Sequence, residues 1–294
     1  MKRIWLNKVY IAKLTTQWTM AAFSLLGLIG MFVSLSDILD STLKFGQRLM
    51  ISVGILIASW LLIFCICSYY VYKKRRIDIF EVNKGHHVYV QYGDVFSEEE
   101  VLKARERRNI VIPVNRCFDT LVDDDLISSK TLHGLSMKKI YDTGVYDQDS
   151  LNKKIQENLK RQLLVPENIE KKDKRSGNLK RYPVGSVAEI TVDCRRTFFF
   201  LGLSSFDKNL KATTTDDEYV LALMRLIEFC YQRSQGYPVV IPLIGAGLSR
   251  TKKTERDILE YMVTLLKLNK ELINCDVHII VRETGKDTIA IMDL

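Results

Sequence analysis

The chain is 294 residues long, and its 43 Lys and Arg residues against 35 Asp and Glu residues give a formal net charge of +8. This excess is confined to residues 1–76, which hold ten basic and two acidic residues, whereas residues 77–294 hold 33 of each. A neutral domain offers no basic groove for a phosphate backbone, so we expect no nucleic acid partner. The six cysteines lack the spacing of metal ligands, which argues against a metal site and against a disulfide framework.

Two long stretches near the N-terminus are uncharged: no Lys, Arg, Asp or Glu falls between residues 13 and 37, or between residues 48 and 73. Each stretch exceeds 20 residues, enough for a helix to cross a hydrocarbon core of about 30 Å. We predict that residues 1–76 form a transmembrane hairpin with spans at about 15–36 and 49–72. A cleaved signal peptide is the alternative for the first stretch, but a second span follows at once.

Basic residues flank this hairpin on one side. Four precede the first span and four follow the second, namely Lys2, Arg3, Lys8 and Lys13, and Lys73, Lys74, Arg75 and Arg76. Because loops rich in Lys and Arg stay in the cytoplasm, we expect a multi-pass protein with both termini cytoplasmic and a small external loop.

The 218 residues that follow are enough for one domain with its own core. Apolar runs predict strands at residues 88–92, 109–114, 186–191, 196–204, 237–242 and 276–282. Helical patterns cover residues 98–107 behind an N-cap at Ser97, 151–164 behind a cap at Asp149 or Ser150, 216–233 and 254–270. Residues 170–177 are a charged turn, which we interpret as a mobile hairpin tip. The alternation predicts an α/β sheet covered on both faces.

The strongest local pattern is the strand at residues 239–241 that runs into Gly245 and Gly247 and then a helix. Two glycines permit positive φ angles, so successive backbone N–H groups can converge on phosphate oxygens near the positive end of the helix. A tight strand-to-helix turn is the alternative. The pattern matches neither a Walker loop nor a dinucleotide fingerprint.

Two other strands end in polar residues. Asp94 follows the strand at residues 88–92, where its carboxylate can accept from an exocyclic amine, and Asn115 ends the strand at 109–114, where its amide can bond ribose hydroxyls. Each is alternatively a turn or cap residue. Because the carboxyl ends of parallel strands meet at one edge of a sheet, we expect both to lie near the glycine-rich turn.

The order of these motifs resembles that of macro domains, α/β modules that bind ADP-ribose. It comprises Gly93-Asp94, residues 111–115, Tyr182-Pro183-Val184-Gly185-Ser186 and residues 242–248. With residues 115–119, Leu132-His133-Gly134 and the N-terminal hairpin, the chain is most similar to the membrane-anchored macro-domain effectors, the ThsA family, of type II Thoeris anti-phage systems. This resemblance implies a macro-domain-like mixed sheet flanked by helices over residues 77–294, preceded by the two-helix transmembrane hairpin.

The resemblance also implies a receptor of the bacterial inner membrane rather than an enzyme. A partner TIR-domain enzyme would make an ADP-ribose-derived messenger, such as histidine–ADP-ribose, whose binding triggers oligomerisation, membrane disruption and death of the infected cell. The implied ligand-binding residues are Asp94 for adenine, Asn115 for the distal ribose, Gly245, Ala246, Gly247 and Leu248 for the pyrophosphate, Gly185 and Ser186 in a facing wall, and His133 and Gly134 at a closing loop. His133 is alternatively a structural hydrogen-bonding residue. No cofactor or metal is implied.

One departure from the family concerns catalysis. Catalytic macro domains have a glycine-rich run after the Asn, whereas residues 116–129 contain no glycine and are acidic at Asp123, Asp124 and Asp125. This loop favours binding over ADP-ribosyl hydrolysis. A membrane-anchored hydrolase and a passive tether for ADP-ribosylated partners remain the alternatives. The acidic run is either a solvated loop face or a contact for a cationic group on the ligand.

Overall fold

The computed structural model describes residues 2–30, 44–82, 85–103, 106–245 and 254–294. The chain divides into two compact units, Met1–Arg75 with Lys286–Leu294, and Arg76–Gly285. The boundary after Arg75 lies one residue from the predicted one. The last nine residues, which were expected in the C-terminal domain, group instead with the N-terminal unit.

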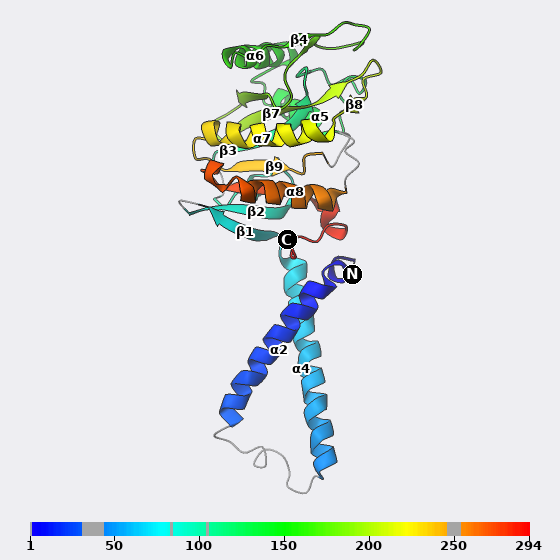
Figure 1. The fold of residues 1–294 in the computed structure, drawn as a ribbon, viewed down its shortest axis with the longest axis vertical. Helices are drawn as coiled ribbons and strands as arrows, with labels where there is room; N and C mark the ends of the chain where they lie inside the picture. The colour runs from blue at the N-terminus through cyan, green and yellow to red at the C-terminus, as the bar shows by residue number, and fades with distance from the viewer. Residues whose placement is uncertain (1, 31–43, 83–84, 104–105, 246–253) are drawn as a thin grey trace. The chain divides into compact units, whose positions relative to one another are not determined.

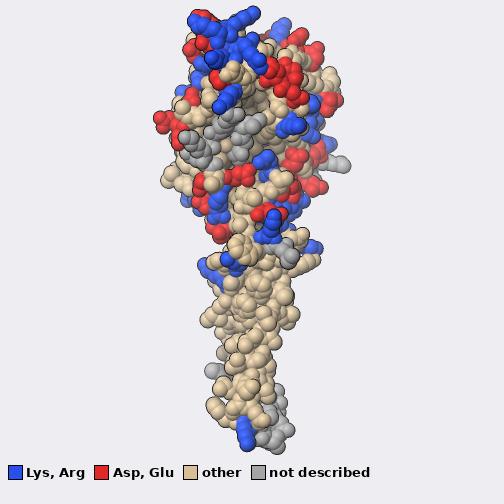
Figure 2. Space-filling view, turned by 90° about the vertical axis from the view of Figure 1, so that its right-hand side faces the viewer, with Lys and Arg blue, Asp and Glu red and all other residues tan. Residues whose placement is uncertain are grey.

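The N-terminal unit consists mainly of helices α1 (Lys2–Leu6), α2 (Lys8–Gly30) and α4 (Phe45–Lys73) (Figure 1). Among the described residues, only α4 is long and apolar enough to cross a membrane. Figure 2 shows that the surface of this part carries almost no charge between its ends. The second predicted span, residues 49–72, thus lies within one helix. Of the first, residues 31–36 lie outside the described residues.

The C-terminal unit is built on a mixed sheet. Its strands, in spatial order, are β1 (Arg76–Val82), β2 (His86–Gly93), β10 (Val277–Arg282), β9 (Val239–Pro242), β3 (Arg108–Asn115), β7 (Arg196–Phe206) and β6 (Val187–Thr191). The five strands from β2 to β7 run parallel, whereas β1 and β6 pair antiparallel at the two edges. Three short strands complete the described fold: β8 (Ala212–Thr213) pairs with β7, and β4 (Glu167–Asn168) pairs with β5 (Lys180–Arg181).

Helices cover both faces of the sheet. Helices α5 (Leu132–Tyr141) and α6 (Gln148–Arg161) share a hydrophobic cluster with β3, β6 and β7, to which Phe198 and Phe200 belong. Phe199 points to the other face and stacks edge-on against Phe229, at a centroid distance of 5.1 Å, on α7 (Asp216–Arg233). Helix α8 (Glu255–Leu268) packs beside α7. Burial on both faces explains why these strands are apolar at every position rather than at alternate ones.

The predicted strands and the helices at residues 216–233 and 254–270 are confirmed, as is the α/β class. The helix predicted at residues 151–164 begins earlier, at Gln148, because the Asp147 carboxylate accepts from the Ser150 N–H and caps it. The helix predicted at residues 98–107 is wrong. Among the described residues of this range, 98–103 and 106–107, only the single 3₁₀ turn η2 (Glu98–Glu100) forms, behind the predicted cap Ser97. The Glu100 side chain is buried, so this segment packs against the domain instead of continuing as a helix.

The charged turn at residues 170–177 lies between β4 and β5, as a hairpin tip should. The tip is nevertheless anchored, because Lys174 is fully buried and its Nζ lies 2.7 Å from the Asp119 carboxylate. This inserted lysine contradicts the interpretation of the tip as mobile.

Candidate functional site

The carboxyl ends of β2, β9 and β3 lie at one edge of the sheet, because these strands are parallel. This geometry brings Asp94, the turn from Leu243 to Gly245, and Asn115 to the same edge, as expected from the sequence. In open α/β sheets this edge is where ligands bind. Ala246, Gly247 and Leu248, the other residues predicted for the turn, lie outside the described residues.

Asp94 is exposed at the end of β2. Its Oδ1 accepts from the Phe96 N–H at 3.0 Å, and its own N–H donates to the buried Glu100 carboxylate at 3.0 Å. The backbone of this turn is therefore fixed on both sides. The exposed carboxylate can still accept from the amine of a ligand.

Asn115 is buried at the end of β3, with 3% of its surface exposed. Its Oδ1 accepts from the Cys117 N–H at 3.0 Å, which holds the turn after the strand. Among the described residues its Nδ2 has no partner in normal hydrogen-bond geometry, although the side chain faces the Asp119 carboxylate. The amide is nonetheless close to Asp119: burial raises the pKa of that carboxyl, and the Asn115 side chain is among the groups that oppose this rise. An unpaired buried donor costs free energy unless a ligand or water accepts from it.

The glycine-rich turn begins from a fixed point. The Tyr219 hydroxyl, from the second turn of α7, donates to the Ile244 carbonyl at 2.9 Å. Burial raises the pKa of Tyr219, so the hydroxyl keeps its proton and remains a donor. The next residue, Gly245, has a φ of 92°, a conformation that side chains disfavour. No sequence motif marks Tyr219, which stands out only by its place on the apolar face of α7.

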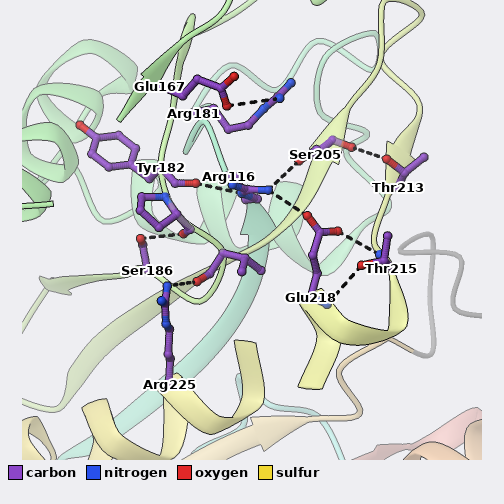
Figure 3. Close-up of polar contacts among 12 residues, drawn as sticks. Arg116, Glu167, Arg181, Tyr182, Ser186, Ser205, Thr213, Thr215, Glu218 and Arg225 are labelled. Carbon is purple, nitrogen blue, oxygen red and sulfur yellow. Dashed lines mark hydrogen bonds and ion pairs between the residues drawn. The ribbon is translucent and has the colours of Figure 1, made fainter. Parts of the chain in front are cut away.

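Gly185 lies against Arg225 and Ala222 of α7, and Figure 3 shows the neighbouring Ser186 near Arg225. Gly185 has a φ of 78°, and a Cβ there would lie 2.8 Å from the Arg225 side chain. Arg225 donates to the Val184 carbonyl at 2.6 Å, and the Ser186 hydroxyl donates to the Pro183 carbonyl at 2.7 Å. Both predicted residues therefore hold the segment in place through packing and local hydrogen bonds.

His133 and Gly134 both make structural contacts within the domain. The His133 Nε2 lies 3.0 Å from the Asp119 carbonyl, and burial lowers the pKa of this imidazole to about 4. The ring is neutral at pH 7, and its Nε2–H donates to that carbonyl. A Cβ at Gly134 would lie 2.2 Å from the Ser128 carbonyl oxygen. The structural role considered for His133 thus fits the geometry, and Gly134 allows the start of α5 to approach the preceding loop.

Arg116 joins three segments of the site and was not predicted. Its Nε donates to the Tyr182 carbonyl at 2.8 Å, and its Nη1 contacts the Glu218 carboxylate at 3.0 Å and the Ser205 hydroxyl at 3.3 Å (Figure 3). Glu218 also caps α7 by accepting from the Thr215 N–H at 3.0 Å. The Arg116 guanidinium therefore connects three segments that carry Tyr182, Ser205 and Glu218. Because Arg116 directly follows Asn115, these contacts hold the end of β3 in place.

The carboxylates of Asp123, Asp124 and Asp125, the acidic run after Asn115, have partners within their own loop or in the β4–β5 hairpin. Asp123 accepts from the N–H groups of Asp125 and Leu126, at 3.0 and 2.7 Å, and Asp124 accepts from the Ser129 N–H at 2.6 Å. Asp125 pairs with Arg175 of the β4–β5 hairpin. These contacts support the interpretation of the run as a loop face over that of a contact for a cationic ligand.

Comparison with known proteins identifies the family. A family model described as the macro domain of the Thoeris protein ThsA matches residues 88–282. The chain belongs to the ThsA macro-domain family. The matched region runs from β2 to the end of β10 and so contains Asp94, Asn115 and Gly245.

Two similar proteins illustrate the match. The Thoeris protein ThsA of Bacillus amyloliquefaciens (strain Y2) is 28% identical over 189 residues, which are 63% of this chain. The chain spans only 58% of that protein's length. The macrodomain of Mycobacterium tuberculosis DarG has a TM-score of 0.39 at 14% identity, covering 65% of this chain and 96% of that one, a likeness too low to carry an argument.

Proposed function

We propose that the domain binds an ADP-ribose-derived signal, such as histidine–ADP-ribose, and that the protein is an effector of anti-phage defence. The observation that carries this proposal is the meeting of Asp94, Asn115 and the Gly245 turn at one edge of a sheet that belongs to the ThsA macro-domain family. A partner TIR-domain enzyme would supply the signal. No nucleic acid enters this proposal.

Each group has a role suited to its chemistry. The exposed Asp94 carboxylate accepts from the adenine amine, and the buried Asn115 Nδ2 donates to the distal ribose. The pyrophosphate lies against backbone N–H groups of the turn that starts at Gly245 and, by sequence, includes Gly247. Binding rather than hydrolysis is proposed, because the loop after Asn115 is glycine-free and holds its own carboxylates.

The membrane part is the proposed output. Helix α4, with α2 and the chain between them, would form the hairpin in the bacterial inner membrane, with both termini cytoplasmic. Two helices cannot enclose a pore, so activation requires several copies of the chain to assemble. Ligand binding can drive this assembly only by favouring one of two states.

Calorimetry of the full chain in nanodiscs, with ADP-ribose as the probe, tests the proposal. We expect wild type to bind, and Asp94→Ala to bind about 10- to 100-fold more weakly, the cost of one hydrogen bond to a charged group. Asp94→Asn keeps the acceptor for the Phe96 N–H and separates the carboxylate's role from that of the turn. Glu157→Ala, on the exposed side of α6, is the control.

Absence of ADP-ribose binding by wild type contradicts the proposal. Release of ADP-ribose from an ADP-ribosylated protein incubated with the chain would favour the hydrolase instead. Unchanged function after exchange of the hairpin for an unrelated anchor would favour the passive tether.

A further inference from the structure

A buried polar cluster lies directly beneath the Asp94 turn. It contains Glu100, Gln91 and His278, of which 5%, 1% and 0% of the surface is exposed, and the half-buried Arg76. These residues come from η2, β2, β10 and β1. Charged and amide groups are rarely buried, because burial removes them from water at a cost in free energy. We therefore expect this cluster to have a function beyond filling space.

Glu100 supports the candidate ligand site from within. Its Oε1 accepts from the Asp94 N–H at 3.0 Å, and its Oε2 accepts from the Gln91 amide. The carboxylate lies directly against Gly93, where an added Cβ would be 2.0 Å from Oε1. A side chain at the position before Asp94 would displace this carboxylate, so Gly93 allows Glu100 to lie against the strand end.

Gln91 connects Glu100 with Arg76 and His278. Its Nε2 donates to the side chain and, at 3.0 Å, to the backbone carbonyl of Glu100, so its Oε1 must face the other way. That oxygen accepts from the Arg76 Nε at 2.5 Å and from the His278 Nδ1 at 3.1 Å. Burial lowers the pKa of His278 to about 3, so the ring is neutral and Nδ1 carries the proton. The amide therefore has one orientation that satisfies all its neighbours.

Arg76 stands at the far end of the cluster. It is the first residue of β1, and it follows directly on the stretch Met1–Arg75, in which the helix α4 ends at Lys73. Its Nη2 donates to the Glu100 carbonyl at 3.0 Å and to the Glu99 carbonyl at 3.3 Å. A continuous set of hydrogen bonds thus connects the Asp94 turn with Arg76, the first residue of β1.

We propose that Glu100, Gln91 and Arg76 are positioning residues that couple ligand binding at Asp94 to β1, and through it to the chain that enters the membrane helix. This inference rests on the proposed function and deepens it. A ligand that binds the Asp94 carboxylate restrains the turn and, through the Asp94 N–H, the Glu100 carboxylate. Gln91 contacts both Glu100 and Arg76, so the restraint extends to Arg76. Coupling of this kind is a free energy shared between two sites, so cutting the network at Arg76 removes the remote response and leaves the ligand contacts in place.

Two substitutions separate coupling from structural support. Arg76→Lys keeps the charge but lacks the Nε that Gln91 accepts from. Glu100→Gln cannot satisfy both the Asp94 N–H and the Gln91 Nε2, since one of these donors must face its new NH₂ group. Arg196→Lys is the matched control, because Arg196 is likewise the half-buried first residue of a strand, with its Nε donating to Asp193 at 2.8 Å.

The experiment measures hydrogen exchange of the full chain in nanodiscs with and without ADP-ribose, alongside its affinity. In wild type and Arg196→Lys, we expect ADP-ribose to slow exchange both at residues 94–100 and in β1, by about fivefold or more in β1. Arg76→Lys keeps wild-type affinity and the slowing at residues 94–100 but loses the slowing in β1. Glu100→Gln binds more weakly and loses the slowing in both segments.

The outcomes distinguish failure of the coupling from failure of the proposed function. If wild type does not bind ADP-ribose, the proposed function fails and takes the coupling with it. If wild type binds but exchange in β1 does not change, or if Arg76→Lys still slows β1, the coupling alone is wrong. Loss of the β1 response in Arg196→Lys would also overturn it, because any strand-terminal arginine would then suffice.

Discussion

At the scale of single residues, the Lys174–Asp119 pair stands out because both side chains are almost completely buried, at 0% and 1% exposed. Lys174 also donates to the Asn178 carbonyl at 2.8 Å, and the Asn178 N–H donates to Asp119 at 2.6 Å. Lys174→Met leaves a buried carboxylate without its cation, so we expect a loss of about 3–5 kcal/mol in the free energy of unfolding, measured by chemical denaturation and circular dichroism. Lys172→Met, at a 72% exposed side chain, should change it by less than about 0.5 kcal/mol.

The same pair predicts a dependence on pH. Burial raises the pKa of Asp119, and the Lys174 ammonium is the main group that opposes the rise. Without the ammonium the pKa of the folded-state carboxyl rises further above its unfolded value of about 3.9, so the folded variant binds a proton first as the pH falls. The deficit of Lys174→Met should therefore shrink between pH 8 and pH 5. A deficit that is constant over this range would show that Asp119 does not titrate there.

His133 gives a prediction of opposite sign for wild type. Burial lowers the pKa of this imidazole to about 4, so the unfolded chain binds a proton at higher pH than the folded chain. The contribution to stability is complete above pH 6.5 and falls by about 2 kcal/mol on acidification to pH 5. His133→Gln keeps a donor for the Asp119 carbonyl and does not titrate. Its stability should fall less over the same interval, and an unchanged profile would contradict the assignment.

At the scale of elements, α6 protects the outer edge of the sheet. Asn158 Oδ1 accepts from the Glu189 N–H at 2.9 Å, and Gln162 Nε2 donates to the Val187 carbonyl at 2.8 Å. These bonds occupy backbone groups of the edge strand β6 that another chain would otherwise pair with. The double variant Asn158→Ala/Gln162→Ala should lose about 1–3 kcal/mol of stability and associate more readily, as seen by light scattering. Lys154→Ala, on the same helix, should do neither.

The sequence predicted those elements whose local pattern and tertiary environment agree. Helix α7 has an apolar face and a capping box from Thr215 to Glu218, and the predicted and observed bounds coincide. The helix after Ser97 fails because the buried contacts of Glu100 outweigh local propensity. Helix α5 was not predicted, and the sequence does not show the close approach to Ser128 that requires glycine at position 134. Strand β1 was missed despite its alternating pattern, since it follows the basic cluster at once.

The candidate site likewise contains residues whose positions could be predicted from the sequence and residues whose contacts could not. Asp94, Asn115 and Gly245 were predictable because each directly follows a recognisable strand, and parallel strands bring their ends together. The role of Arg116 could not be predicted, because its partner Glu218 lies 102 residues away along the chain. Contacts of this kind depend on how the helices pack on the sheet, and no short motif in the sequence records them.

At the scale of the whole molecule, the distribution of charge predicts a membrane topology. The basic residues lie before the first apolar stretch and after the second, so both should remain in the cytoplasm if both stretches cross the membrane. Lys44, just before α4, would then lie on the external side and Lys8 on the cytoplasmic side. The native Cys194 is exposed and reports on the C-terminal domain.

Labelling of right-side-out membrane vesicles with a membrane-impermeant maleimide tests this arrangement. We expect Lys44→Cys to react in intact vesicles, and Lys8→Cys and Cys194 to react only after detergent is added, with Cys194→Ser as the background that assigns each signal. Reaction of Lys8→Cys in intact vesicles would mean that α4 alone crosses, because the N-terminus would then share the external side with Lys44. That result would leave the macro domain cytoplasmic but remove the hairpin from the proposed mechanism, since a single helix would have to assemble instead.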